Sequence, residues 1–245
     1  MTQLGLPDTI QACLFDLDGV VTKTAVVHAA AWKETFDALL RAYDGEQGRP
    51  FDDADYDEYV DGRPRADGVR AFLDSRGIRL PEGGPGDPPD ARTVHGIGNR
   101  KNELLLEKIR TGGVEAYEGT LRYLEAVRAQ GLRTAIVSSS ANCRDVLRAV
   151  GAEHLFDTRI DGVVAAERNL PGKPHPDTFL AAARDLGVEA SRAAVFEDAL
   201  AGMDAGRAGG FGYVVGVDRV GQTDALYKHG ADTVVRDLAE LGDKQ

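Results

Sequence analysis

Two pairs of acidic residues stand directly after short apolar runs. Asp16 and Asp18 follow one such run near the start of the chain, and Glu197 and Asp198 follow another much later. Short apolar runs are typical of buried strands, and an acid at the end of a buried strand has no packing reason to be there. If the two strands are neighbours in a parallel sheet, Asp16, Glu197 and Asp198 could meet in one crevice. Three crowded carboxylates repel one another unless a cation lies among them, and oxygen ligands suit Mg²⁺.

Each acidic pair also has a simpler interpretation. The Asp-x-Asp pattern recurs at Asp53 and Asp55 and again at Asp55 and Asp57, where we expect only a solvated acidic loop. The first copy differs because it follows a predicted strand, although a plain turn at the strand end is an alternative. For Glu197 and Asp198 the alternative is the N-cap of a helix whose first turn starts at Ala199.

A third cluster, residues 138–142, follows the predicted strand at 133–137 and opens a helix. Hydroxyl and backbone N–H groups at a helix N-terminus can form a pocket for an anion. Plain capping of the helix by Ser140 or Asn142 is the alternative, and both roles are compatible.

Lys173 forms the fourth cluster, in the sequence Gly-Lys-Pro-His-Pro. The two prolines stiffen the loop, so the ammonium group would be fixed and would point back at the same edge of the sheet. An ordinary solvated lysine is the alternative.

The elements that would position these residues alternate between strand and helix from about Gly119 onward. Strands alternating with helices of about 10–15 residues predict βαβ units and a parallel sheet. The predicted strands span residues 10–15, 133–137, 193–196, 212–217 and 233–235, and the predicted helices span residues 120–130, 176–186, 200–208 and 224–229, with another helix starting at Asn142.

A mostly helical segment interrupts this pattern after the first strand. One helix is predicted over residues 25–43, because apolar residues recur there at helical spacing: His28, Trp32, Phe36, Leu39 and Tyr43. Further helices are predicted near residues 67–76 and 99–110, on either side of a surface loop at 81–89 that holds four prolines.

We therefore predict an α/β fold with two domains. A Rossmann-like parallel sheet with helices on both faces would be formed by residues 1–23 and 112–245, and an inserted α-helical cap domain by residues 24–111.

Composition and charge exclude several classes of protein. The chain has 245 residues, of which 42% are hydrophobic and 28% charged, as in ordinary globular proteins. The formal net charge of −11 disfavours nucleic-acid binding. No apolar run reaches the roughly 18–20 residues that cross a membrane, and no signal peptide is recognisable. With only Cys13 and Cys143 present, a disulfide framework is not expected, so we predict a cytoplasmic protein. We also predict a monomer.

The four clusters, in this order, resemble the motifs of the haloacid dehalogenase superfamily of phosphotransferases. The matching pattern is Asp-x-Asp-Gly-Val, then a serine after the second strand, then Gly-Lys-Pro, then Glu-Asp. Within that superfamily the chain is most similar to the β-phosphoglucomutase family, over nearly its whole length. The finer resemblance is carried by Thr24, His28, Trp32, residues 62–65, residues 100–102 and residues 138–142.

The resemblance implies a role for each matching residue. Asp16 would be the nucleophile that becomes an aspartyl-phosphate, and Asp18 would be the general acid/base. Mg²⁺ would be held by Asp16, the backbone carbonyl of Asp18, Glu197 and Asp198. Ser138 and Lys173 would bind the transferring phosphoryl group. The distal phosphate of a sugar bisphosphate would be bound by Arg65, Ser140 and Asn142. The substrate-binding residues in the cap would be Thr24, His28, Trp32 and Lys101, of which Thr24, His28 and Lys101 would connect cap closure to Asp18.

The cap residues have structural alternatives. His28 and Trp32 lie on an apolar helix face, which suits core packing as well as function. Arg65 could be an ordinary surface arginine, and Lys101 could mark a solvated helix start. The chain also departs from the family pattern in having Lys23 before Thr24, where these enzymes usually have an acid, and Ala141, where some carry a lysine.

The implied activity is the interconversion of β-D-glucose 1-phosphate and glucose 6-phosphate through glucose 1,6-bisphosphate. A Mg²⁺-dependent sugar-phosphate phosphatase of the same superfamily is the alternative, since only the acceptor of the phosphoryl group differs. A phospho-acceptor signalling domain is a third interpretation, but such domains lack both the acid/base residue and the helical cap. A catalytically inactive relative is disfavoured because all the acids are present.

Overall fold

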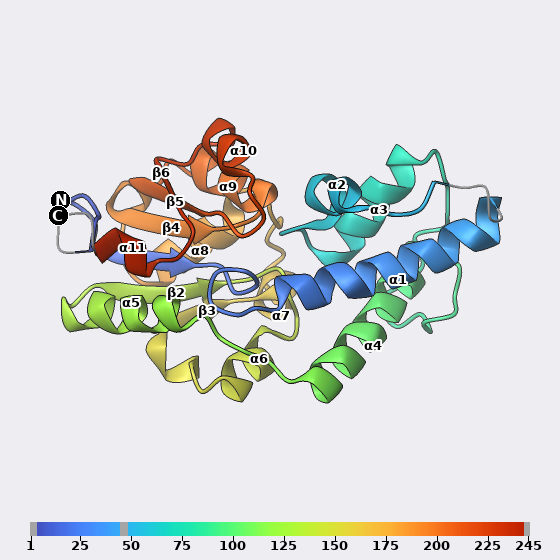
Figure 1. Cartoon of the computed structure of the whole chain (residues 1–245), viewed down its shortest axis with the longest axis horizontal. Coiled ribbons are helices and arrows are strands. Elements are labelled where there is room, and N and C mark those ends of the chain that lie inside the picture. Colours follow the sequence, from blue (N-terminus) through green and yellow to red (C-terminus); the bar gives the residue numbers. More distant parts are fainter. Residues whose placement is uncertain (1–3, 45–48, 243–245) are drawn as a thin grey trace. The chain divides into compact units, whose positions relative to one another are not determined.

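The computed structural model describes residues 4–44 and 49–242 (Figure 1). The chain folds into two compact units: the segment up to Lys23 joins the segment from Val114 onward, and the segment Thr24–Gly113 forms the second. We call them the core unit and the cap unit. No helix among the described residues is long and apolar enough to cross a membrane.

The core unit is built on a parallel sheet of six strands in the order β3-β2-β1-β4-β5-β6. This confirms the predicted Rossmann-like sheet, whose strand order reverses on either side of β1. The strands are β1 (Ala12–Phe15), β2 (Arg133–Val137), β3 (Thr158–Ile160), β4 (Ala193–Glu197), β5 (Tyr213–Val217) and β6 (Thr233–Val235). Five of them were predicted, whereas β3 was not.

The register of the three central strands decides which residues meet. Phe15 at the end of β1 is level with Ile136 of β2 and with Phe196 of β4. The residues that follow these three positions therefore emerge at the same edge of the sheet, as the sequence predicted.

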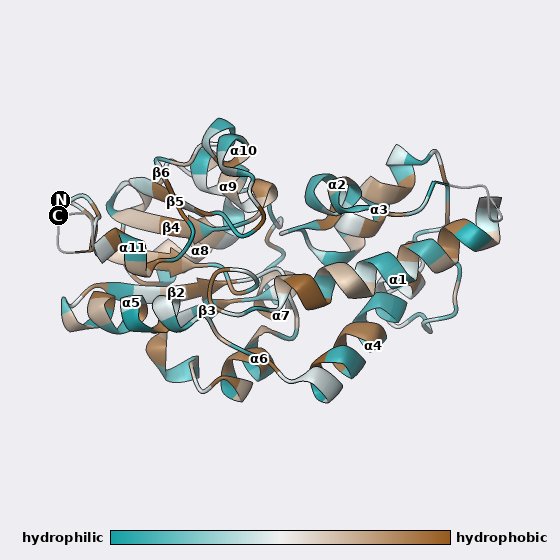
Figure 2. Ribbon diagram, in the orientation of Figure 1, coloured by the Kyte–Doolittle hydropathy of each residue, from teal (hydrophilic) through white to brown (hydrophobic). Residues whose placement is uncertain are grey.

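Helices cover both faces of the sheet because successive strand side chains point to opposite faces. Phe15 and Phe196 stack with ring centroids 4.3 Å apart and face Tyr123 of α5. Leu14 points the other way, into a core shared with Phe179 of α8. Figure 2 shows α5 with hydrophilic and hydrophobic residues along the same helix. The helices of this unit are α5 (Glu118–Ala129), α6 (Cys143–Ala149), α7 (Gly162–Glu167), α8 (Asp177–Asp185), α9 (Leu200–Ala208), α10 (Thr223–Lys228) and α11 (Ala239–Gly242), with 3₁₀ turns η3 (Glu153–Leu155) and η4 (Ala190–Arg192).

The cap unit is helical, with an aromatic core. Trp32 and Phe36 stack at 5.0 Å, and Phe36 also contacts Phe51 and Phe72. Trp32 is therefore a core residue, whereas Tyr43, predicted on the same face, is 49% exposed because the helix outruns the core there. The elements are α1 (Ala25–Asp44), α2 (Asp53–Asp55), the π-helical turn η2 (Tyr56–Val60), α3 (Arg65–Ser75) and α4 (Val94–Gly112).

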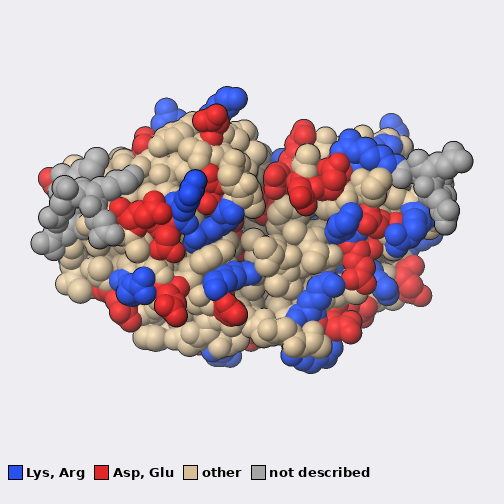
Figure 3. Space-filling model, viewed as in Figure 1, with Lys and Arg blue, Asp and Glu red and all other residues tan. Residues whose placement is uncertain are grey.

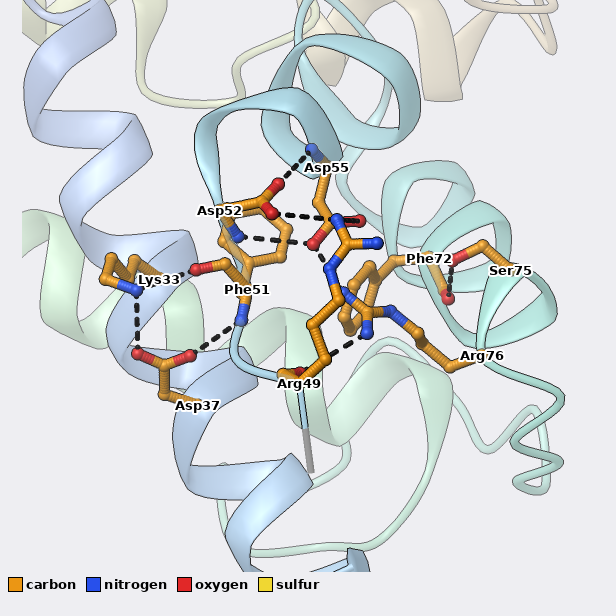
Figure 4. Close-up of polar contacts among 9 residues, drawn as sticks. All are labelled: Lys33, Asp37, Arg49, Phe51, Asp52, Asp55, Phe72, Ser75 and Arg76. Carbon is orange, nitrogen blue, oxygen red and sulfur yellow. Dashed lines mark hydrogen bonds and ion pairs between the residues drawn. The ribbon is translucent and has the colours of Figure 1, made fainter. Parts of the chain in front are cut away.

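The acidic stretch at the start of α2 is not the solvated loop that the sequence suggested. Asp55 is only 4% exposed, and its carboxylate forms ion pairs with Arg76 at 2.5 Å and Arg49 at 3.4 Å (Figure 4). Asp52 and Asp55 also form a capping box, in which each side chain accepts a hydrogen bond from the backbone N–H of the other.

The proline- and glycine-rich loop before α4 has a defined conformation. Thr93 caps α4 by accepting a hydrogen bond from the Gly96 N–H, and its hydroxyl donates to Asp87 at 2.6 Å. The Asn99 side-chain amide donates to the carbonyl oxygens of Pro85 and Asp87, at 3.1 and 2.8 Å. This cap extends α4 five residues before its predicted start. Elsewhere, both signs of charge are mixed over the visible surface (Figure 3).

Candidate active site

A buried lysine joins two of the acids at the carboxyl edge of the sheet. The Lys173 ammonium lies 2.5 Å from a carboxylate oxygen of Asp16 and 2.5 Å from one of Glu197, and it also donates to the Val137 carbonyl oxygen at 3.1 Å. All three side chains are nearly inaccessible to solvent. Lys173 is thus not the solvated loop residue of the simpler interpretation, and it links Asp16, directly after β1, with the last residues of β2 and β4.

Glu197 has both carboxylate oxygens engaged. One binds Lys173, and the other accepts hydrogen bonds from the backbone N–H groups of Asp198 and Ala199, each at 3.0 Å. A Cβ atom at Gly202 in α9 would lie 1.8 Å from the first of these oxygens. The glycine therefore leaves room for the carboxylate, and Glu197 is more than the helix N-cap of the simpler interpretation.

The third acid of the cluster, Asp198, packs against the loop that follows β1. One oxygen from each of Asp16, Glu197 and Asp198 lies within 4.8 Å of the others, and all three residues are buried. Gly19 has φ +89°, and a Cβ there would lie 1.6 Å from an Asp198 carboxylate oxygen. Both the backbone conformation and the close approach require glycine at this position.

A tight loop carries Asp18 just beyond Asp16. The Gly19 N–H donates to the Thr22 carbonyl oxygen at 2.7 Å, and the Val21 and Thr22 N–H groups both donate to the Leu17 carbonyl oxygen. Asp18 is half-buried, whereas Asp16 is 6% exposed. The chain thus places one enclosed and one more accessible carboxylate two residues apart.

Burial and neighbouring charges shift the ionisation of this cluster. Burial is the main cause that raises the pKa of Asp16 well above its usual value, with smaller contributions from the Glu197 and Asp18 charges, while Lys173 opposes the shift. Burial alone would lower the pKa of Lys173, but Asp16 and Glu197 outweigh it, so the pKa is raised and the ammonium stays charged.

The loop after β2 presents hydroxyl and N–H groups beside the acids. The Ser138 hydroxyl accepts a hydrogen bond from the Ser140 N–H at 3.1 Å, and the Ser140 hydroxyl accepts one from the Asn142 N–H at 3.2 Å. These contacts order the loop, while neither Ser140 nor Asn142 caps α6 through its side chain in the predicted way, because the bonds fall within the loop. Ser138 itself is 2% exposed and directly follows β2.

The cap residues predicted from the sequence fall into two groups. Lys101 is 4% exposed, with its ammonium 2.9 Å from His28 Nδ1 and 4.8 Å from the centre of the Trp32 ring. It is therefore buried rather than a solvated helix start. Thr24, which is 1% exposed, directly precedes α1, and its carbonyl oxygen accepts a hydrogen bond from the His28 N–H.

Arg65 forms the second group, at the start of α3. Its guanidinium donates to the Asn99 side-chain oxygen at 3.1 Å and to the Gly98 carbonyl oxygen at 3.4 Å. Partial burial lowers the pKa of Arg65. Within the described ranges of the chain, Arg65 forms no ion pair with a carboxylate, and it lines a pocket of about 210 Å³ in the cap unit. The pocket is lined by Arg65, Ala66, Pro85, Val94, His95, Gly98 and Asn99.

Comparison with known proteins identifies the family of this chain. The family model for haloacid dehalogenase-like hydrolases matches residues 10–210. The chain belongs to this family. The resemblance of the sequence to this superfamily is thereby confirmed.

Individual relatives show which members of the family this chain is similar to. A β-phosphoglucomutase from Mycobacterium tuberculosis is 56% identical over 245 residues, which cover 97% of this chain and 94% of that protein. The structure of β-phosphoglucomutase from Clostridium difficile has a TM-score of 0.74 at 26% identity, covering 95% of this chain and 93% of that one. A mutant of CbbY from Rhodobacter sphaeroides in complex with xylulose-(1,5)bisphosphate has a TM-score of 0.70 at 26% identity, covering 95% of this chain and 96% of that one.

The acidic cluster of this haloacid dehalogenase-like protein fits a divalent cation. Three buried carboxylates bring three negative charges, and the Lys173 ammonium offsets one of them. The donor atoms are all oxygen, which is the ligand set that hard divalent cations prefer. Glycines at 19 and 202 leave space for two of these carboxylates, so the surrounding backbone is shaped to the cluster.

Sequence reasoning missed the loop after β5. Arg219 donates to the Gly19 carbonyl oxygen at 2.7 Å, and Gln222 donates to the Asp198 carbonyl oxygen at 3.1 Å. The signal was available, because Asp218 to Gln222 also follow a predicted strand and reach the same edge of the sheet. It was overlooked because arginine and glutamine are common on surfaces.

Proposed function

We propose that the protein is a Mg²⁺-dependent β-phosphoglucomutase, which interconverts β-D-glucose 1-phosphate and glucose 6-phosphate. The observation that carries this proposal is the buried cluster of Asp16, Lys173, Glu197 and Asp198 at the carboxyl edge of the sheet. The 56% identity to a β-phosphoglucomutase over nearly the full chain directs the choice of substrate.

The metal site is proposed to be formed by Asp16, Asp198, Glu197 and the backbone carbonyl of Asp18. Bound Mg²⁺ would supply positive charge that offsets the repulsion between these carboxylates and an incoming phosphate dianion. Because Glu197 already binds Lys173 and two backbone N–H groups, we propose that it also holds the other ligands in place.

Asp16 is proposed to be the nucleophile. One carboxylate oxygen would attack the phosphorus of the bound phosphate ester, forming an aspartyl-phosphate as the bond from phosphorus to the leaving sugar oxygen breaks. The Asp16 oxygen that binds Lys173 is held by that contact, so the second oxygen of the carboxylate would be the one that attacks.

Asp18 is proposed to move the proton. It would protonate the leaving sugar oxygen in the first step and accept the proton of the attacking hydroxyl in the second. Its half-buried position, two residues after the nucleophile, suits contact with the sugar oxygen. Assistance of this kind is typically worth about 10²–10⁴-fold in rate.

Lys173 and Ser138 are proposed to hold the transferring phosphoryl group. Charge spread over its three outer oxygens is stabilised by nearby cations and hydrogen-bond donors. Lys173 is charged and fixed by three contacts, and Ser138 is fixed by its hydrogen bond from the Ser140 N–H.

A mutase must also hold a second phosphate, because its intermediate is a sugar bisphosphate. We propose that Arg65 binds this phosphate together with Ser140 and Asn142. Arg65 is a half-buried cation without a carboxylate partner among the described residues, and its fork of N–H groups suits phosphate. The CbbY complex with xylulose-(1,5)bisphosphate shows that a protein of this fold accommodates a sugar bisphosphate. Thr24, His28, Trp32 and Lys101 are proposed to connect the cap to the position of Asp18.

We further propose a monomeric enzyme of the cytoplasm. Both cysteines are free and buried.

The deciding experiment separates mutase from phosphatase. The protein is given Mg²⁺, β-glucose 1-phosphate and a trace of glucose 1,6-bisphosphate, and glucose 6-phosphate and free phosphate are measured in the same sample. Glucose 6-phosphate as the main product supports the mutase. Free phosphate as the main product would show that the protein is a sugar-phosphate phosphatase instead. If neither product formed, both proposed activities would be wrong.

Replacing Arg65 with alanine tests the second phosphate site. We expect the Michaelis constant for glucose 1,6-bisphosphate to rise about 10–100-fold, on the scale of losing a charge-assisted hydrogen bond of about 1.5–3 kcal/mol. Hydrolysis of a simple phosphate monoester should change much less. An equal loss in both reactions would contradict the assignment of Arg65.

A further inference from the structure

The loop between β5 and α10 reaches two backbone positions of the acidic edge. Arg219 Nε donates to the Gly19 carbonyl oxygen at 2.7 Å, and Gln222 Nε2 donates to the Asp198 carbonyl oxygen at 3.1 Å. Neither side chain has a role in the mechanism proposed above. Each contacts one of the two loops that carry the acids: Arg219 contacts the loop after β1, and Gln222 contacts the loop after β4.

These two backbone positions belong to loops that touch. The close approach of Gly19 to the Asp198 carboxylate leaves no space for a Cβ atom. The loops carry like charges, at Asp16 and Asp198, whose oxygens lie within 4.8 Å of each other. Like charges at this distance push the loops apart, so contacts that hold both backbones would oppose that repulsion.

The loop that provides these contacts is itself held in place. Asp218 is 8% exposed and accepts hydrogen bonds from the Gly221 and Gln222 N–H groups at 2.7 and 2.9 Å. The Thr223 hydroxyl also donates to Asp218. The backbone of Gln222 is thus held by Asp218, while its side chain reaches the Asp198 carbonyl oxygen.

Arg219 is fixed at its guanidinium group. The group lies 3.5 Å from the centre of the Tyr117 ring, and its Nη1 atom donates to the Arg236 carbonyl oxygen. The side chain is only 15% exposed. An arginine ordered by an aromatic ring on one face and a carbonyl oxygen at its end can hold the Gly19 carbonyl oxygen at a set position.

We propose that Arg219 and Gln222 are positioning residues for the metal site: they set the separation of the Asp16–Gly19 loop and the Asp198 backbone, and thereby the affinity for Mg²⁺. This inference rests on the proposed function for the identity of the metal ligands. The two residues touch no ligand atom, and they act through the backbone that carries the ligands.

Two variants test the proposal by removing the donor group while keeping an unbranched aliphatic stem: Arg219→Met and Gln222→Met. Direct titration of Mg²⁺ into the purified full chain by calorimetry should give a dissociation constant about 10-fold higher for each variant, at the lower end of the 10–100-fold range typical for groups that orient metal ligands. Gln222 is only partly buried, so its variant should fold even if the Arg219 variant does not.

A matched control lies at the opposite edge of the same sheet. Arg128 donates to the Leu155 carbonyl oxygen at 3.1 Å and pairs with Asp157 at 3.4 Å, near the amino end of β2. Arg128→Met should lower the melting temperature without Mg²⁺ while leaving the Mg²⁺ dissociation constant within about twofold of wild type. Arg219→Lys, which keeps the charge and one donor group, should recover part of the lost affinity.

The outcomes separate this inference from the proposed function. If the wild-type chain binds Mg²⁺ and both methionine variants bind it equally well, the positioning role is wrong and the proposed function is untouched. If Arg128→Met weakens Mg²⁺ binding as much as the other two, the effect is general destabilisation, and the inference also fails. If the wild-type chain binds no Mg²⁺, the metal site of the proposed function fails, and the inference fails with it. If the wild-type chain forms glucose 6-phosphate but the two methionine variants form none even at saturating Mg²⁺, the inference is also wrong, because a defect that acts through metal affinity is overcome by excess metal.

Discussion

Two Asp-x-Asp pairs, one in each unit, contain one buried aspartate each, Asp16 and Asp55, and they differ in how the charge of that aspartate is matched. Asp55 in the cap unit has two arginines around one buried carboxylate (Figure 4). Asp16 in the core unit shares one lysine with Glu197 and has Asp198 close by. A buried acid that is fully paired serves the fold, whereas several acids gathered around one cation are suited to bind another cation.

The largest expected difference is catalytic. Asp16→Asn should reduce glucose 6-phosphate formation by a factor of at least about 10³, on the scale seen when an enzyme loses its nucleophile. Asp53→Asn, at the first acid of the other copy, should leave the rate unchanged. The measurement of glucose 6-phosphate described above is made on both variants. Comparable losses in the two variants would erase the distinction between the clusters.

Stability should separate the clusters next. Lys173→Met leaves Asp16 and Glu197 buried without their shared cation, so we expect a loss of about 3–5 kcal/mol in the free energy of unfolding, measured by urea denaturation. Added Mg²⁺ should restore part of that loss. Arg76→Met should cost less, about 1–3 kcal/mol, because Arg49 still contacts Asp55. Mg²⁺ should not reduce the stability difference between the Arg76 variant and wild type. If Mg²⁺ restored the stability of this variant, the metal site would not be confined to the core unit.

A glycine pair tests the space around Glu197. Alanine normally stabilises a helix by up to about 1 kcal/mol relative to glycine. Gly112→Ala, at the open end of α4, should show this gain because no atom lies within 4 Å of the new Cβ. Gly202→Ala should instead destabilise by about 1–3 kcal/mol, since its Cβ would overlap the Glu197 carboxylate. A stabilised Gly202 variant would show that Glu197 can move away freely.

The smallest effect is expected at the exposed edge of the paired cluster. Arg49 is 61% exposed, and solvent screens its ion pairs with Asp52 and Asp55. Arg49→Met should therefore leave the urea midpoint within the error of the wild-type value. A clear shift would mean that Asp55 depends on both arginines rather than mainly on Arg76.

Local patterns in the sequence were enough to predict the sheet and the residues at its edge. The apolar runs before Asp16 and Glu197 predicted two buried strands, and the structure shows that these strands are neighbours. The strand β3 was missed since Thr158, Arg159 and Ile160 are too few and too polar for a periodic signal.

Contacts between distant segments could not be read in this way. The burial of Asp55 depends on Arg49 and Arg76, which come from separate segments of the cap unit. The burial of Lys101 likewise depends on His28 and Trp32 of another helix. The sequence indicated residues whose side chains could take part in chemistry, whereas the partners of those side chains are seen only in the three-dimensional structure.

The position of β1 at the centre of the sheet has a consequence for how the protein is made. This strand is synthesised before both of its neighbours, and one of them, β4, follows only after the cap unit, β2 and β3. Until then, the β1 edge that pairs with β4 has unpaired N–H and C=O groups, and such edges are prone to wrong pairing. The nascent chain therefore contains Asp16 well before the residues that surround it in the folded protein are made.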